Sequence, residues 1–260
     1  MNDDRETASG IDDRLRFVRG RIEAACERSG RRPEEVTLIA VSKTRPFSDV
    51  MDAWEAGVVH FGENYVQEMT RKMELAENGG KAGSVQWHMI GHLQKNKVKY
   101  LIGRTALIHS VDSVSLAEQI EKEAEKRDQT VRILLEVNVA REESKWGFDL
   151  TSVFQAAREI SALPRVRVLG LMTSAPCTEE PETNRLFFRQ LNACARELAA
   201  AGLLASSDPD FHVPVLSMGM SGDYEVAVEE GATMVRVGTL IFGKRDVPAH
   251  QVSLEAPCGR

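Results

Sequence analysis

Residues 213–238 read VPVLSMGMSGDYEVAVEEGATMVRVG, and this stretch indicates the fold of the whole chain. An apolar run, residues 213–218, is followed by a short amphipathic segment, residues 223–230, and then by a second apolar run, residues 233–238. Short apolar runs predict strands buried on both faces, and the amphipathic segment between them predicts a helix. This order of strand, helix and strand is typical of a parallel sheet covered by helices.

The same alternation extends towards the N-terminus. A leading helix is predicted over residues 11–29, where Leu15, Val18 and Ile22 recur at helical spacing. Six further apolar runs occupy residues 36–42, 58–62, 85–91, 106–111, 131–139 and 166–172. The other helical candidates occupy residues 48–56, 64–77, 115–127, 150–162 and 182–201.

Eight strands that alternate with helices predict a single closed (β/α)8 barrel, which typically takes about 250 residues. An open doubly wound sheet is the alternative that the pattern leaves open. We expect residues 1–10 to form a flexible N-terminus, residues 11–245 the barrel domain and residues 246–260 a loose tail. No stretch rich in Pro, Gly and Ser divides the barrel region.

Composition restricts the function classes. The net charge of −6, from 33 basic and 39 acidic residues, argues against a general nucleic-acid binder. No apolar run reaches the roughly 18 residues of a membrane span, and residues 1–10 (MNDDRETASG) lack the features of a secretion signal. The cysteines are scattered without a CxxC pair, so we expect neither a disulfide framework nor a cysteine zinc site, and a cytoplasmic location fits. They are Cys26, Cys177, Cys194 and Cys258.

Lys43 is a candidate nucleophile at the end of the first predicted strand. Period-two alternation puts Thr37, Ile39, Val41 and Lys43 on one face, so the amine is expected at the barrel mouth, where catalytic residues lie in this fold. Desolvation favours the neutral amine, which forms Schiff bases with aldehydes and ketones. A solvated lysine at a strand end is the alternative.

The turns after the last two strands are candidates for binding a phosphate. Ser221 lies in the first turn, and Gly238 and Thr239 form the second. Small residues at strand-to-helix turns let N–H groups converge on an anion, and the loops after strands seven and eight often do so in this fold. Turns that need glycine for backbone geometry alone are the alternative.

Two further patterns lie near these turns and in the third predicted strand. Arg236 shares a face with Met234 and Gly238, so its guanidinium should face an anion, an acceptor nitrogen or a loop carboxylate. His88 and His92 are four residues apart but not on a helix, so the pattern does not predict a metal site.

Seven segments carry a family resemblance. They are residues 39–46 (IAVSKTRP), 61–68 (FGENYVQE), 87–97 (WHMIGHLQKNK), 109–113 (HSVDS), 137–139 with 143–148 (VNV and ESKWGF), 170–176 (GLMTSAP) and 216–243 (LSMGMSGDYEVAVEEGATMVRVGTLIFG). In this order and at this spacing they resemble the pyridoxal phosphate homeostasis protein family, single-domain relatives of the alanine racemase barrel. The resemblance covers residues 11–245 and implies a fold-type III pyridoxal phosphate protein.

The resemblance implies roles for the candidate residues. Lys43 stands where the family lysine holds pyridoxal 5′-phosphate as an internal aldimine, and Ser221, Gly238 and Thr239 look like the phosphate cradle. Arg236 is similar to the arginine that faces the pyridine nitrogen in alanine racemase. Asn64 is implied as a neighbour of the ring, and Lys145 stands where the family also carries a lysine.

The implied function is a binding protein that buffers pyridoxal phosphate for vitamin B6 homeostasis and delivers it to apo forms of pyridoxal phosphate enzymes. An arginine at the ring nitrogen disfavours ring protonation and weakens the electron sink. We also expect the chain to lack the second domain of alanine racemase, which supplies an opposing tyrosine. Robust catalysis is therefore not expected. We expect a monomer or weak homodimer that has neither nucleic-acid nor membrane partners. A pyridoxal phosphate-dependent racemase is the alternative, and a Schiff-base aldolase is a more distant one.

Overall fold

The structure, a computed structural model, describes residues 10–81, 83–142 and 144–243. Most of the predicted flexible N-terminus and all of the predicted tail, residues 246–260, lie outside the described residues.

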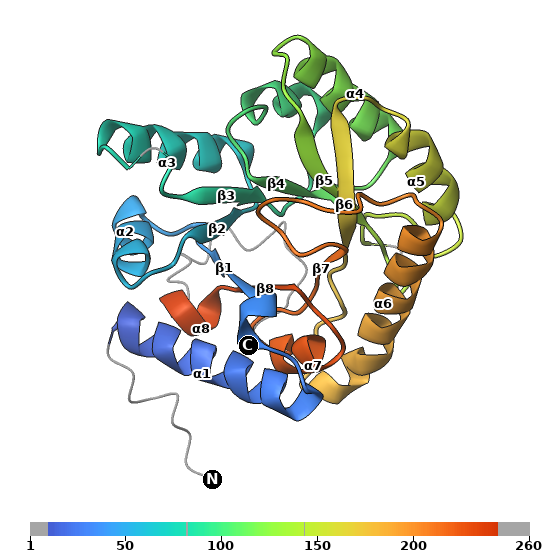
Figure 1. Cartoon of the computed structure of the whole chain (residues 1–260). Coiled ribbons are helices and arrows are strands. Elements are labelled where there is room, and N and C mark those ends of the chain that lie inside the picture. Colours follow the sequence, from blue (N-terminus) through green and yellow to red (C-terminus); the bar gives the residue numbers. More distant parts are fainter. Residues whose placement is uncertain (1–9, 82, 143, 244–260) are drawn as a thin grey trace.

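Eight parallel strands form a closed barrel in chain order, and β1 pairs with β8 (Figure 1). The strands are β1 (Thr37–Val41), β2 (His60–Glu63), β3 (Gln86–Met89), β4 (Leu107–Val111), β5 (Val131–Glu136), β6 (Val166–Met172), β7 (Val215–Ser217) and β8 (Met234–Val237). The predicted barrel is confirmed, and the open sheet is excluded.

Helices surround the strands (Figure 1). The α-helices are α1 (Ile11–Ser29), α2 (Phe47–Glu55), α3 (Val66–Asn78), α4 (Val114–Glu125), α5 (Val153–Ser161), α6 (Arg185–Ala200), α7 (Tyr224–Glu229) and α8 (Thr239–Phe242). The described residues also form 3₁₀ turns between these elements: η1 (Pro33–Glu35), η2 (Lys95–Tyr100) and η3 (Pro181–Asn184). The sequence analysis missed α8, because four residues are too few to show helical periodicity.

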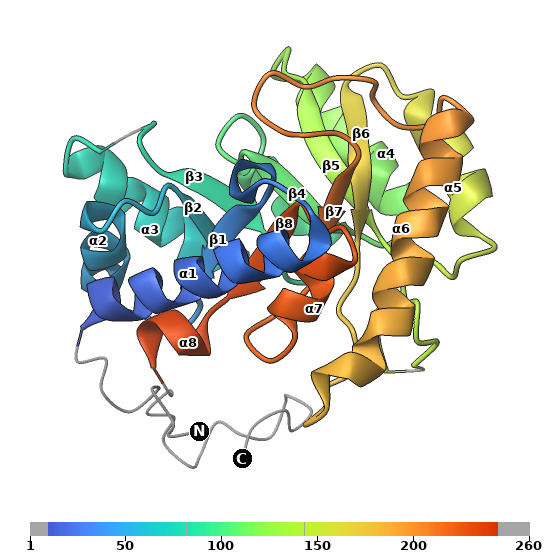
Figure 2. The same ribbon diagram turned by 60° about the horizontal axis from the view of Figure 1, so that its bottom comes forward.

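Helix α1 lies beside α7 and α8 on one side of the barrel (Figures 1 and 2). Its buried residues include Leu15, Val18 and Ile22, the helical spacing predicted from the sequence. The Arg28 side chain forms an ion pair with Glu229 of α7 at 2.6 Å. This helix therefore covers the outside of the last two βα units, whose turns hold the candidate anion site. None of the helices in the described ranges has the length and apolar character needed to cross a bilayer.

Two apolar cores result from the alternation of strand side chains. A larger core packs the helices against the outer faces of the strands and includes Ala40, Val235 and Val237. A smaller core fills the barrel and includes Ile39 and Met234, neighbours of those residues in β1 and β8. Side chains at alternate positions of one strand therefore point inward, as period two requires. The inward series continues to the carboxyl ends of the strands, where the candidate site lies.

Candidate functional site

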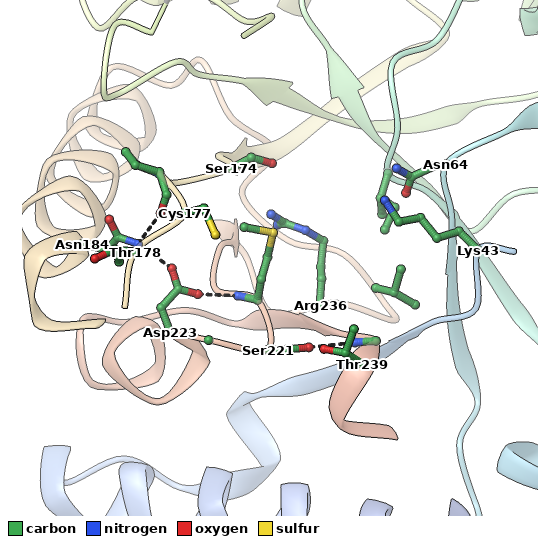
Figure 3. A pocket seen from close by; sticks show the side chains of 16 residues that line it. Lys43, Asn64, Ser174, Cys177, Thr178, Asn184, Ser221, Asp223, Arg236 and Thr239 are labelled. Atoms are coloured by element: carbon green, nitrogen blue, oxygen red, sulfur yellow. Dashed lines mark hydrogen bonds between the residues drawn. The ribbon is translucent and has the colours of Figure 1, made fainter. Parts of the chain in front are cut away.

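A cavity of about 440 Å³ opens at the carboxyl ends of the strands. All six residues that the sequence analysis named as cofactor-binding candidates line it, and Figure 3 shows Lys43 and Asn64 facing Arg236, Ser221 and Thr239 across it. They come from β1, β2, β7 and β8 and from the turns that follow these strands. The candidates are Lys43, Asn64, Ser221, Arg236, Gly238 and Thr239.

Strand β1 directs Lys43 to the cavity. Ile39 belongs to the barrel core, and Val41 lines the cavity, so the predicted inward face of this strand is confirmed. Lys43 follows in the next inward position and is half-buried. Thr44 then adopts a left-handed conformation with φ of 63°, which turns the chain away from the strand direction. The amine therefore stands at the mouth on a tightly turned segment.

A buried charge cluster holds the backbone on both sides of Lys43. The Lys72 amine of α3 donates to the Ser42 carbonyl at 2.7 Å and to Glu63 Oε1 at 2.7 Å. The Thr44 N–H donates to Glu68 Oε1 at 2.7 Å, and Glu68 also accepts from Lys72. Burial raises the pKa of Glu63, and Lys72 opposes this rise. The sequence analysis did not identify this cluster, although Glu68 and Lys72 lie four residues apart on α3, a spacing that pairs charges on one helix face.

Close packing places Asn64 opposite the end of β3. A Cβ added to Gly91 would lie 2.4 Å from the Asn64 carbonyl oxygen, so only glycine allows the two loops to approach this closely. Asn64 is half-buried and lines the cavity beside Lys43 (Figure 3). The loop after β2 therefore brings an amide next to the amine.

The turns after β7 and β8 meet through one hydrogen bond. The Gly238 N–H donates to Ser221 Oγ at 3.2 Å. Gly219, with φ of 89°, starts the first turn, where an added Cβ would lie 2.6 Å from that of Ala227. Asp223 then fixes this turn, because its carboxylate accepts from the Met220 N–H at 2.7 Å. Hydroxyls and backbone N–H groups thus gather at one side of the cavity, as anion binding requires.

Arg236 forms the floor of the cavity from the third position of β8. Its Nη1 donates to Ser217 Oγ at 2.7 Å, and its Nη2 donates to the Thr173 carbonyl at 2.8 Å. Burial lowers the pKa of the guanidinium to about 10, and Asp223 and Glu136 oppose this fall. The group therefore stays charged at neutral pH. Among the described residues, a hydroxyl and a carbonyl accept the hydrogen bonds of the Arg236 guanidinium. The salt bridge to a loop carboxylate, which the sequence analysis gave as the alternative, is not formed by these residues.

Glu136, at the end of β5, is a titratable group that the sequence analysis missed. It follows the inward-facing Leu134 by two residues, and burial raises the pKa of its carboxyl to about 7. The Asp112 carboxylate adds to this rise, whereas Arg236 and Lys145 oppose it. The mouth of the barrel therefore carries a carboxyl group that is partly protonated near neutral pH.

We expect Glu136→Gln to change how stability depends on pH. A carboxyl whose folded pKa lies above its unfolded value binds more protons in the folded state, so the wild type loses stability as the pH rises from about 4.5 to about 7. For this one group, the free energy of unfolding falls by at most about 1.4 kcal/mol per pH unit. The glutamine variant lacks this loss. The difference between its free energy of unfolding and that of the wild type should therefore shift in favour of the variant as the pH rises across that range. Denaturant unfolding at several pH values measures the difference, and a difference independent of pH would contradict the raised pKa.

These residues fit a phosphate-bearing aldehyde. The cavity volume is in the range of about 300–1,000 Å³ typical of small-molecule sites. An amine stands on one side of the cavity, hydroxyls and N–H groups stand on another, and a guanidinium also lines it (Figure 3). An aldehyde, a phosphate and an acceptor nitrogen are the groups that such a set of donors can bind.

Sequence reasoning missed further polar residues of the barrel. Ser217, Thr173 and His109 are buried behind Arg236, and Asn184 donates to Asp223 at 2.8 Å at the edge of the cavity. Each of three successive predicted strands contains a histidine, and this was the available signal for the buried polar residues. Alternation within one strand does not reveal which residues of different strands lie next to each other in the barrel. Cys26 and Cys194 are free and buried, whereas Cys177 is disulfide-bonded, which the sequence analysis did not expect. Cys258 lies outside the described residues.

The chain is similar to known proteins in sequence and in fold. Residues 19–246 match the family model described as alanine racemase, N-terminal domain. The chain is 44% identical to the pyridoxal phosphate homeostasis protein of Aquifex aeolicus over 90% of this chain and 97% of that one. A crystal structure of an unknown protein from Bifidobacterium adolescentis is 39% identical, with a TM-score of 0.82 over 93% of this chain and 97% of that one.

Two further solved structures are similar to this chain. PipY of Synechococcus elongatus, solved with PLP bound, is 33% identical, with a TM-score of 0.75 over 90% of this chain and 100% of that one. An alanine racemase from Clostridium difficile is 15% identical, with a TM-score of 0.67 over 90% of this chain and 60% of that one. The racemase likeness shows a shared fold only.

Proposed function

The chain belongs to the pyridoxal phosphate homeostasis protein family, and from this premise we propose that it binds pyridoxal 5′-phosphate in the cavity between Lys43 and Ser221. The observation that carries the proposal is the convergence of an amine, a guanidinium and two hydroxyl-bearing turns from four strands on one cavity. When bound, this cofactor supplies an aldehyde that reacts with amines and a ring that withdraws electrons from them.

Each side chain has a proposed task. The Lys43 amine holds the aldehyde carbon covalently, and Asn64 lies beside the ring. Ser221, Thr239 and the Gly238 backbone bind the phosphate. Arg236, which stays charged at neutral pH, faces the ring nitrogen and disfavours its protonation. This electrostatic arrangement supports holding the cofactor rather than using it in carbanion chemistry.

We propose that the protein buffers pyridoxal phosphate in vitamin B6 homeostasis and delivers it to apo forms of pyridoxal phosphate enzymes. A reactive aldehyde held by a reversible bond at an open mouth can be released to another acceptor. The delivery step, a cytoplasmic location and a monomer or weak homodimer remain predictions from the sequence.

The test of cofactor binding uses the full-length protein. Purified protein is incubated with pyridoxal phosphate, its visible absorbance is recorded, and the sample is reduced with borohydride and digested. We expect a chromophore that borohydride abolishes and a single labelled peptide that contains Lys43. An absent chromophore, or a label on another lysine, would contradict the proposal.

An amino-acid racemase is the alternative function. Racemisation needs a second base facing Lys43, and within the described residues no tyrosine lines the cavity. Deuterium exchange at Cα of a panel of amino acids separates the two functions. Exchange no faster than with free cofactor supports a carrier, whereas exchange at turnover rates supports the enzyme.

A further inference from the structure

Three imidazoles form a line of hydrogen bonds inside the barrel. His60 Nδ1 lies 3.0 Å from His88 Nε2, and His88 Nδ1 lies 2.8 Å from His109 Nε2. The three residues come from the adjacent strands β2, β3 and β4. His60 is the first residue of β2 and is half-buried, whereas His88 and His109 are completely buried. The line therefore runs from the amino end of the barrel into its centre.

The line ends on Arg236 at the cavity. His109 Nδ1 lies 2.9 Å from Ser217 Oγ, and this hydroxyl accepts a hydrogen bond from Arg236 Nη1 at 2.7 Å. A continuous series of side chains thus joins the amino end of the barrel to the guanidinium on the cavity floor. The series is His60, His88, His109, Ser217 and Arg236.

The surroundings of the line are apolar. Phe211 packs against both His60 and His88, with ring centroids 6.3 and 6.1 Å apart, and belongs to the barrel core with Leu107 and Leu134. Burial lowers the pKa of all three imidazoles, so they are neutral at pH 7. They follow one another instead of converging on a point, and no cluster of metal-binding side chains occurs in the part of the chain that the structure describes.

The chemistry of the two ends sets a direction for these hydrogen bonds. A guanidinium is a donor only, so Ser217 Oγ must accept from Arg236. The single Ser217 hydroxyl proton has His109 Nδ1 as its acceptor, and no second acceptor for it lies within hydrogen-bond distance among the described residues. His109 Nδ1 is then bare, and its proton is on Nε2, which donates to His88 Nδ1. By the same step His88 Nε2 donates to His60 Nδ1.

The reverse direction is less favourable for a physical reason. If His109 Nδ1 carried the proton, Ser217 Oγ would accept two hydrogen bonds, and its own buried proton would have no acceptor. An unpaired buried donor is costly, so the series has one preferred direction along its whole length.

We propose that His60, His88 and His109 are positioning residues, which act through Ser217 to hold the Arg236 guanidinium in place at the cavity. The line fills the acceptor position behind Arg236 with a hydroxyl that cannot rotate away, because its proton is engaged by His109. Arg236 is thereby held from behind by neutral groups and keeps its positive charge for a ligand in the cavity. The role of this charge towards pyridoxal phosphate rests on the proposed function; the direction of the hydrogen bonds does not.

The first test needs neither ligand nor variant. Long-range proton–nitrogen NMR of ¹⁵N-histidine-labelled full-length protein at neutral pH reports which ring nitrogen carries the proton. We expect His60, His88 and His109 to be neutral with the proton on Nε2. A proton on Nδ1 of His88 or His109, or a doubly protonated ring, would overturn the proposal.

The second test breaks the line at one hydroxyl. Ser217→Ala removes the acceptor of Arg236 and the donor to His109, whereas Arg236 keeps its bond to the Thr173 carbonyl. Ser110→Ala is the matched control, because the hydroxyl of Ser110 on β4 is buried like that of Ser217 on β7, but its Oγ donates to the Gly91 carbonyl outside the line. We expect Ser217→Ala to populate both tautomers of His109 and to weaken the binding of pyridoxal phosphate about tenfold. Ser110→Ala should change neither.

The two tests separate this proposal from the proposed function. If Ser217→Ala and Ser110→Ala have equal effects on the His109 tautomer and on binding, the positioning role is wrong even though the protein binds the cofactor. If the wild type fails to bind pyridoxal phosphate, the proposed function is wrong, and the NMR result alone decides the direction of the line. Failure of Ser217→Ala to fold leaves the same NMR result decisive.

Discussion

A Lys43→Ala variant is expected to give no borohydride-dependent label and no chromophore with pyridoxal phosphate. Lys43 is the amine that the β1 alternation directs into the cavity, and the phosphate-binding turns belong to other elements, after β7 and β8. Removing the amine therefore abolishes the covalent bond and leaves the anion donors in place. The half-buried side chain contributes little to the core, so the free energy of unfolding should stay within about 1 kcal/mol of the wild type.

Two measurements accompany this variant. Equilibrium dialysis detects the weaker, non-covalent binding that the intact phosphate turns should retain. Lys95→Ala is the control, because Lys95 is an exposed lysine of η2 that does not line the cavity, and its label should equal that of the wild type. A label that survives in Lys43→Ala, or gross unfolding of that variant, would contradict the assignment.

Lys72→Met should cause the largest loss of stability. Lys72 is 4% exposed and pairs with Glu63, which is fully buried, at 2.7 Å. Removing one partner of a buried ion pair leaves an uncompensated charge and costs about 3–5 kcal/mol. The cost should be large here, because Glu63 Oε2 has no hydrogen-bond partner among the described residues even with Lys72 present. Denaturant unfolding at neutral pH measures the loss.

The pH dependence identifies the cause of that loss. Without Lys72, Glu63 binds a proton more tightly in the folded state than in the unfolded state, so stability falls as the pH rises above the ordinary pKa of glutamate. The variant should therefore lose more at about pH 8 than at about pH 5. Lys72→Met combined with Glu63→Leu removes both charges and should recover most of the stability. Equal stabilities of the single and double variants would refute this explanation.

The Lys72 cluster also connects stability with the site. Lys72 and Glu68 bind the backbone of Ser42 and Thr44, the two neighbours of Lys43. We therefore expect both Lys72 variants to label Lys43 more slowly than the wild type does when all three are measured under conditions in which they are folded, because both lack the Lys72 amine that binds the Ser42 carbonyl. The cluster thus holds the backbone on both sides of Lys43.

The fold could be predicted because its signal is local. Each strand of a parallel barrel is apolar on both faces, and each connecting segment is amphipathic, so runs of four to nine residues reveal the order of elements. The boundaries are less certain where the last turn of an element is polar. Strand β5, for example, ends at Glu136 rather than at Val139, because the chain there leaves the sheet to form the loop that follows. Helix α8 was missed because its four residues are too few to show helical periodicity.

The candidate site was predictable in part for the same reason. Lys43 and Arg236 each continue an alternating series within one strand, and Ser221 and Gly238 lie in turns whose small residues are visible in the sequence. The structure brings all of them to one cavity, whereas their roles towards the cofactor remain predictions. Glu136 was missed because its raised pKa depends on burial and on Asp112, which follows the neighbouring strand β4.

The sequence by itself determined which residues face into the barrel and in what order the strands follow, because a period of two or of 3.6 is a property of neighbouring residues. Only the tertiary structure decided which residues of different strands stand at the same level. His109 and Ser217 are 108 positions apart, and their hydrogen bond exists because the closed sheet and its register bring β4 and β7 together across the interior. Register and closure depend on the packing of all eight strands at once, and no short segment carries that information.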